Sequence, residues 1–238
     1  VLYGIAVILL LVTLASTPIR GARAWIIFGN FTFEPAELAK LALIIVTAKY
    51  FSQRHIHINQ FRHVAISGLY VLIPISIILL QPDLGSASTL VVIWAGMLMA
   101  SGINKRHLFL LASIGVILAY LSWVFILKPY QKERLVAFVN PYADPTGIGY
   151  NIIQSKIAIG SGGWFGAGWG KGSQATLGFL PEPYNDFVFA SFAEQFGFLG
   201  VTALAGLLLT ILLRIFRIGE RSNNNFGKLF AIGMALFI

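Results

Sequence analysis

Ionisable residues in this chain gather near the ends of long apolar segments. Asp186 follows the stretch Leu180-Pro-Glu-Pro-Tyr-Asn and stands directly before an apolar run. Aspartate is a common N-cap, which is one interpretation of this position. A carboxylate beside an apolar surface is also a place where desolvation raises the pKa toward the range of a general base. The position of Asp186 alone fits both interpretations.

Other acids are placed where they could join the same chemistry. Glu37 and Lys40 are three residues apart, so on a helix they share a face and either neutralise each other or serve one site. Asp83 lies in a short turn between two apolar runs, and Glu194 lies two helical turns beyond Asp186. Ionisable groups at membrane depth are costly, so each is a functional candidate.

Several cations lie in the polar segments that hold most of the acids. Arginine binds phosphate with two parallel hydrogen bonds, and lysine binds it as a point charge. A pool of such cations beside carboxylates predicts a substrate that carries phosphate groups. The cations are Arg20, Arg23, Arg134, Lys156 and Lys171.

A glycine-rich stretch, residues 159–173, lies between the cations of the longest polar segment. Glycines allow backbone N–H groups to approach an anion closely. The stretch is not a Walker A loop, because Gly172 follows Lys171 and Phe165 stands where that motif requires glycine. The chain also contains no G-x-G-x-x-G motif, so the sequence gives no support for a nucleotide site.

The composition requires a membrane around these groups. Of the 238 residues, 57% are hydrophobic and 11% are charged, and the mean hydropathy is +0.80. A soluble domain is about a quarter charged, so a soluble enzyme is excluded. The absence of cysteine excludes a disulfide framework and any thiolate metal site.

The apolar segments predict an all-α, polytopic membrane helix bundle, a single membrane domain truncated at both ends. A span needs about 20 apolar residues. The segment before Phe51 reaches this length by extending back to Pro35, which is tolerated in a first helical turn. The first segment could instead be a signal peptide, because Ala22-Arg-Ala24 resembles a cleavage site. The predicted spans are 1–16, 35–51, 64–80, 84–100, 108–127, 187–213 and 229–238, with a large outer loop at 128–186.

The distribution of charge predicts the orientation of the bundle. The alternate loops 49–63, 101–107 and 214–228 hold nine of the 17 Lys and Arg residues, so we place them in the cytoplasm. Membrane topology therefore explains the basic excess, and no nucleic-acid partner is expected. His55 and His57 could bind a metal, or they simply lie in a solvated loop. All the acids except Glu220 fall toward the outer side, which indicates a functional outer face.

Six segments in the same order across the chain together resemble the SEDS family, the shape, elongation, division and sporulation proteins. Two of them, Gln154-Ser-Lys156 with its surroundings and Gly172-Ser-Gln174, resemble the elongation branch of the family more than the division branch. The six segments are Gly21-Ala-Arg-Ala-Trp-Ile26, Phe33-Glu-Pro-Ala-Glu-Leu-Ala-Lys40, Gln81-Pro-Asp-Leu-Gly85, Asn140-Pro-Tyr-Ala-Asp-Pro145, residues 149–163 and Leu180-Pro-Glu-Pro-Tyr-Asn-Asp-Phe-Val-Phe189.

The resemblance implies a glycosyltransferase of about ten spans, of which this chain would be a fragment. It would polymerise lipid II into glycan strands at the outer face of the bacterial cytoplasmic membrane. The family motifs place an essential aspartate at Asp186, and further functional residues at Arg23, Glu37 and Lys40. The chain departs from the family pattern at Ala24, Glu34-Pro-Ala-Glu37, Tyr184-Asn185 and Gln195. These departures bear on subtype and rate more than on reaction type.

Together these observations give a mechanistic hypothesis. Asp186 acts as general base on the acceptor sugar, and cations receive the departing undecaprenyl pyrophosphate. The cations expected there are Arg23, Lys40, Arg134 and Lys156, while Glu37, Asp83 and Glu194 orient them or hold a divalent cation such as Mg²⁺ or Mn²⁺. The resemblance also implies a class B penicillin-binding protein, a transpeptidase, as partner. The alternative functions are a lipid II flippase and a non-catalytic scaffold for a transpeptidase.

Overall fold

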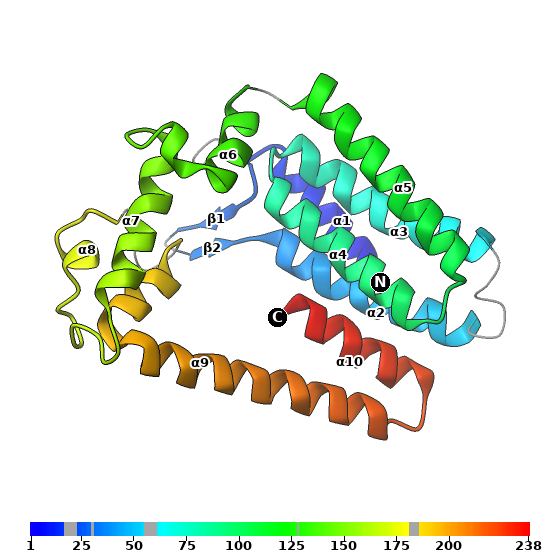
Figure 1. Ribbon diagram of the computed structural model, residues 1–238. Helices are drawn as coiled ribbons and strands as arrows, with labels where there is room; N and C mark the ends of the chain where they lie inside the picture. The colour runs from blue at the N-terminus through cyan, green and yellow to red at the C-terminus, as the bar shows by residue number, and fades with distance from the viewer. Residues whose placement is uncertain (17–22, 30, 55–60, 128, 181–185) are drawn as a thin grey trace. The chain divides into compact units, whose positions relative to one another are not determined.

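Figure 1 shows the computed structural model, which describes residues 1–16, 23–29, 31–54, 61–127, 129–180 and 186–238. In these residues the chain is helical apart from turns, short connections and one two-stranded hairpin. It forms two compact units, Val1–Ala112 with Leu212–Ile238 (unit 1) and Ser113–Ile211 (unit 2). The predicted all-α class is confirmed.

Unit 1 is a bundle around one central helix. Helix α2 contacts α1, α3, α4 and α10. It begins at Pro35, whose missing N–H is not needed in a first helical turn. Glu37 lies in the same turn, where its negative charge interacts favourably with the positive end of the helix dipole. The bounds are α1 Leu2–Thr13, α2 Pro35–Arg54, α3 Phe61–Leu80, α4 Leu84–Ala100 and α10 Asn225–Phe237. The hairpin precedes α2, with β1 (Ile26–Phe28) antiparallel to β2 (Phe31–Phe33).

The core of unit 1 lies where α2 meets its neighbours. Leu43, Ile44 and Phe51 of α2 are fully buried. Ile44 and Phe51 belong to one apolar cluster with Ile93 and Met97 of α4. Packing of this kind, and not local propensity, supplies most of the stability of helices.

Unit 2 contains most of the segment that the sequence predicts as an outer loop. Helix α5 (Lys105–Leu121) enters it and continues into a π-helical turn, η1 (Ser122–Ile126). Then follow α6 (Pro129–Val139), the short 3₁₀ helix η2 (Pro141–Ala143), α7 (Ile148–Ser161), the one-turn α8 (Ser173–Thr176) and most of α9 (Val188–Arg221). The described part of the predicted loop, residues 129–180, is therefore a folded and largely helical segment, as its aromatic content favours.

Three of the described helices are long and apolar enough to cross a membrane: α3, α5 with η1, and α9. The most apolar window of α5 has no buried residue and that of α9 is 6% buried, so both helices expose apolar surface. Helix α9 ends at Arg221 and α10 begins at Asn225, whereas the sequence predicts spans at 187–213 and 229–238. The span boundaries themselves stay predictions.

Candidate active site

Asp186 lies in an exposed turn at the beginning of α9. The first helical residue is Val188, so Phe187 and not Asp186 directly precedes the helix. The side chain of Asp186 is exposed, and the described residues do not supply the desolvation expected for a general base. Residues 181–185 lie outside the described residues. The exposure leaves the carboxylate accessible to a substrate.

Glu194 lies on the same helix and is almost fully buried, with 1% of its surface exposed. Its carboxylate accepts hydrogen bonds from the backbone N–H of Gln174 at 2.8 Å and of Ala175 at 3.3 Å, and from the hydroxyl of Ser173 at 3.2 Å. These donors form the beginning of α8, whose N–H groups have no partner within the helix. Glu194 therefore joins α8 to α9.

The glycine-rich stretch fills a break in α9. The helix is interrupted at Gly197, whose φ is 63° and ψ is −164°. Ala167 N–H donates to the carbonyl of Glu194 at 2.9 Å, and Gly168 N–H donates to that of Gln195 at 3.0 Å. On the other side of the break, Phe198 N–H donates to Gly163 O and Leu199 N–H to Trp164 O. The stretch thus satisfies the backbone groups that the break exposes.

This arrangement corrects the interpretation that the glycine-rich stretch offers its amides to an anion. The amides of Ala167, Gly168 and Gly170 donate to acceptors on α9, and that of Gly166 donates to Gly162 O. Glycine is required because the chains approach closely. A Cβ at Gly166 would meet the carbonyl of Gln195, and one at Gly162 would meet that of Ala193.

Unit 1 brings three of the predicted site residues close to one another. Lys40 Nζ lies 2.7 Å from Glu37 Oε1, and the lysine side chain is 10% exposed against 49% for the glutamate. Asp83 accepts from the N–H of Ser86 at 3.1 Å and so caps α4. Glu34 accepts from the hydroxyl of the same serine at 3.3 Å. Mutual neutralisation of Glu37 and Lys40, one of the two alternatives, is therefore seen.

The acids in this group affect one another. Burial raises the pKa of Glu34 above its ordinary value, and the negative charges of Asp83 and Glu37 raise it further. Lys40 and the hydroxyl of Ser86 act in the opposite direction. Glu34, which the sequence analysis notes only as a departure from the family pattern, therefore belongs electrostatically to this group.

Gln81 connects Arg23 to the bundle, a role that sequence reasoning missed. Its side-chain amide is buried and donates to Leu10 O at 2.9 Å and to Thr13 Oγ1 at 2.6 Å. The backbone carbonyl of Gln81 accepts a hydrogen bond from the backbone N–H of Arg23 at 3.4 Å. The exposed guanidinium of Arg23 donates to Leu14 O at 3.2 Å. The sequence signal that could have indicated this anchor is an amide directly at the end of an apolar run, where its polar groups need partners.

Three further predicted cations, Arg134, Lys156 and Lys171, lie in unit 2. Arg134 on α6 and Lys156 on α7 are exposed, and Lys156 Nζ lies 5.8 Å from the ring centre of Tyr142. Arg20, His55 and His57 lie outside the described residues. Arg23, Glu37, Lys40 and Asp83 thus belong to unit 1, and Arg134, Lys156, Asp186 and Glu194 to unit 2.

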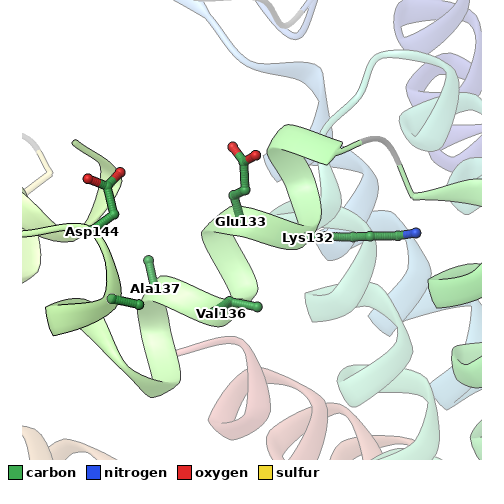
Figure 2. Close-up of a pocket in the computed structure, with 6 residues that line it drawn as sticks. Lys132, Glu133, Val136, Ala137 and Asp144 are labelled. Carbon is green, nitrogen blue, oxygen red and sulfur yellow. The ribbon is translucent and has the colours of Figure 1, made fainter.

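A pocket of about 240 Å³ lies between α6 and η2 in unit 2. Figure 2 shows the carboxylates of Glu133 and Asp144 projecting on the same side, while Lys132 points away from them. Asp144 also accepts from the N–H of Gly147 at 3.0 Å, which shapes the turn before α7. The described residues contain no group of three or more His, Asp or Glu side chains placed to hold a metal ion.

Comparison with known proteins connects this geometry to a family. The profile of the cell cycle protein family of FtsW, RodA and SpoVE matches residues 1–238. The chain belongs to the SEDS family. The chain is 34% identical over 238 residues to peptidoglycan glycosyltransferase MrdB of Escherichia coli K12, and covers 64% of that protein. It is 36% identical over 237 residues to the probable peptidoglycan glycosyltransferase FtsW of Haemophilus influenzae, covering 59% of it.

Solved structures of SEDS proteins share the fold. One is a chain of a peptidoglycan synthase complex described as coordinating polymerization and crosslinking, with a TM-score of 0.80, 32% identity, and coverage of 99% of this chain and 65% of that one. Another is RodA of Thermus thermophilus, with a TM-score of 0.66, 30% identity, and coverage of 99% and 60%. This SEDS chain is thus a multi-pass membrane protein, and these likenesses favour the elongation branch. It spans less than two thirds of the length of these relatives.

Proposed function

We propose that this SEDS chain forms the catalytic part of a peptidoglycan glycosyltransferase that polymerises lipid II for cell elongation. The observation that carries the proposal is its 34% identity, across every residue, to a protein named as such an enzyme. The exposed carboxylate of Asp186 at the beginning of a membrane-length helix adds physical support. A general base must be reachable by its substrate, and Asp186 is.

In the proposed reaction, Asp186 takes a proton from the C4 hydroxyl of the acceptor GlcNAc. The hydroxyl oxygen attacks the anomeric carbon of the donor MurNAc, and the bond from that carbon to undecaprenyl pyrophosphate breaks with its electron pair leaving on the pyrophosphate. A single displacement inverts the anomeric centre. The chain leaves Asp186 exposed, so the acceptor sugar can approach its carboxylate from solvent.

Cations would stabilise the leaving pyrophosphate. Arg23, Arg134 and Lys156 have exposed side chains that can reach a substrate. Lys40 is nearly buried and paired with Glu37, so its ammonium group is held in place. It would act on the pyrophosphate through its fixed positive charge. A divalent cation would supply the same neutralisation when bound. The described residues contain no group of three or more acids or histidines that would hold it without the substrate, and no step above depends on it.

The flippase alternative receives less support. Transporters use discontinuous helices near the bilayer midplane, whose free ends bind substrate or ions. The break in α9 at Gly197 is of this kind, but it lies near one end of the helix, and residues 163–168 bond the backbone groups around it. The break in α9 therefore provides the backbone groups to which residues 163–168 bond. A scaffold without catalysis would not need an accessible carboxylate at Asp186.

The likeness to a chain of a peptidoglycan synthase complex supports a crosslinking partner, and we propose a class B penicillin-binding protein. The proposed place of catalysis is the outer face of the cytoplasmic membrane. This proposal rests on the sequence alone, in which the acids and the long polar segment alternate with the loops that are rich in Lys and Arg.

The test uses the complete protein with its transpeptidase in liposomes, with lipid II supplied from outside. A polymerase makes glycan polymer under these conditions, whereas a flippase moves fluorescent lipid II between leaflets and leaves it monomeric. Polymer formation would support the proposal. Transfer between leaflets without polymer would overturn it in favour of the flippase, and neither activity would favour the scaffold. Adding a chelator to the same assay tests whether a divalent cation is needed.

A further inference from the structure

A second pocket in unit 2 lies beside the beginning of α9. Its volume is about 560 Å³, within the usual range of small-molecule sites. Residues between 169 and 176 line one side of the pocket, and residues from the first turns of α9 line the other. The lining residues are Trp169, Gly170, Ala175, Thr176, Val188, Ser191, Phe192, Gln195 and Phe196.

Three aromatic rings in contact with one another line this pocket, which we call the Trp169 pocket. Phe192 stacks on Phe196 with the ring centres 4.5 Å apart, and Trp169 meets Phe196 edge to face at 5.6 Å. Trp169 is 81% exposed, so the described residues leave most of its indole surface uncovered. An exposed indole beside stacked phenyl rings is an apolar surface that a ligand could cover.

The polar groups of the pocket are already bonded to the chain. Gln195 accepts from the N–H of Gly170 at 2.9 Å and donates to the hydroxyl of Ser191 at 3.2 Å. Thr176 donates its hydroxyl hydrogen to the carbonyl of Gly172 at 2.6 Å. These bonds use part of the hydrogen-bonding capacity of the few polar side chains, and most of the lining residues are apolar or aromatic. The lining therefore suits a hydrocarbon chain better than a polar head group.

The place of the pocket limits which hydrocarbon chain it can take. Val188 lines it and stands two residues after Asp186, at the end of a helix long enough to span a membrane. Lys171, exposed, directly follows the lining residue Gly170. An apolar pocket with a neighbouring cation fits a lipid whose chain begins at an anionic phosphate group.

We propose that the Trp169 pocket binds the isoprenoid chain of the lipid-linked sugar substrate, next to its diphosphate. This inference rests on the proposed function and adds a binding residue to it. Trp169 would contact the isoprenoid chain of the substrate, and Asp186 would act on the sugars. Covering an aromatic wall with hydrocarbon is favourable, and removing one indole should weaken binding about fivefold to tenfold.

The chain offers a closely matched control. Trp164 belongs to the same glycine-rich stretch, is 67% exposed, and meets Phe198 edge to face at 5.1 Å, but it does not line the pocket. The variants are therefore Trp169→Ala and Trp164→Ala in the complete protein. One probe is farnesyl diphosphate carrying a benzophenone, with undecaprenyl phosphate as competitor. The other is phosphatidylglycerol carrying a photoreactive group in its acyl chain.

We expect the isoprenoid probe to label peptides that contain the lining residues. Trp169→Ala should reduce this labelling about fivefold to tenfold and raise KM for lipid II with kcat nearly unchanged, whereas Trp164→Ala should change neither more than about twofold. Equal effects of the two substitutions, or equal labelling by the phosphatidylglycerol probe, would overturn the inference. If the unmodified protein polymerises lipid II in the same series, either result leaves the proposed function standing; if it makes no polymer, the proposed function itself fails.

Discussion

Glu194 Oε1 lies 2.8 Å from the backbone nitrogen of Gln174, although twenty residues separate them in the sequence. This contact fastens the one-turn helix α8 to the membrane-length helix α9. Gly172, just before α8, has no room for a side chain, because a Cβ there would lie 2.5 Å from Glu194 Oε2. One buried carboxylate thus holds α8 against α9.

Replacing Glu194 should therefore destabilise unit 2. Glu194→Ala leaves the partly buried amide of Gln174 and the buried amide of Ala175 without this acceptor, and we expect the free energy of unfolding to fall by roughly 2–3 kcal/mol. Glu194→Gln keeps one acceptor oxygen and should lose less. The measurement is thermal unfolding of the purified protein in detergent. Glu220→Ala, an exposed acid on the same helix, is the control, and a loss equal to that of Glu194→Ala would contradict the anchoring role.

The close approach of the glycine-rich stretch to α9 can be tested separately from backbone strain. Gly166 and Gly163 both have positive φ values, 78° and 52°. A Cβ at Gly166 would collide with the carbonyl of Gln195, whereas one at Gly163 has no atom within 4 Å. We expect Gly163→Ala to cost about 1 kcal/mol of stability from strain alone. Gly166→Ala should cost roughly 2–4 kcal/mol, and equal losses would show that α9 is not packed against the stretch.

Glu34 gives a pH dependence with a definite sign. Its folded pKa lies above the ordinary value of 4.5, mainly because of burial. At a pH between the unfolded and the folded pKa of Glu34, the folded protein binds more protons than the unfolded chain. The free energy of unfolding therefore falls as pH rises through this interval. Glu34→Gln should therefore raise the unfolding temperature at neutral pH and remove this fall.

Unfolding temperatures measured between about pH 4 and pH 8 check this expectation. Glu133→Gln, an exposed acid on α6, serves as the control and should leave the profile unchanged. A fall in stability that persists in Glu34→Gln would assign it to another group.

The helices were the easiest feature to predict. Apolar runs of membrane length indicate α3, α5 and α9 directly, and the proline rule places the beginning of α2 at Pro35. The helices inside residues 128–186 were not predicted, because α6 and α7 combine polar surface with short length and pack within their own unit. Their periodic signal is correspondingly weak.

The candidate site was predicted in its residue types but not in its connections. Glu37 and Lys40 pair because their spacing is local and helical. Glu194 and Gln81 find partners twenty or more residues away, and nothing in the spacing of a sequence names those partners. The glycine-rich stretch was interpreted as a possible anion cradle, whereas its amides bond to α9, since the break at Gly197 is visible only in three dimensions.

The role of Asp186 as general base is tested most directly by the rate of lipid II polymerisation by the complete protein carrying Asp186→Asn. Asn keeps the size of the side chain and removes its basicity, so we expect the rate to fall at least about a hundredfold with an unchanged unfolding temperature. Asp144→Asn, an exposed acid in the same unit that retains its turn-forming oxygen, should polymerise at the normal rate. Polymerisation by Asp186→Asn within about twofold of the unmodified protein would contradict the account.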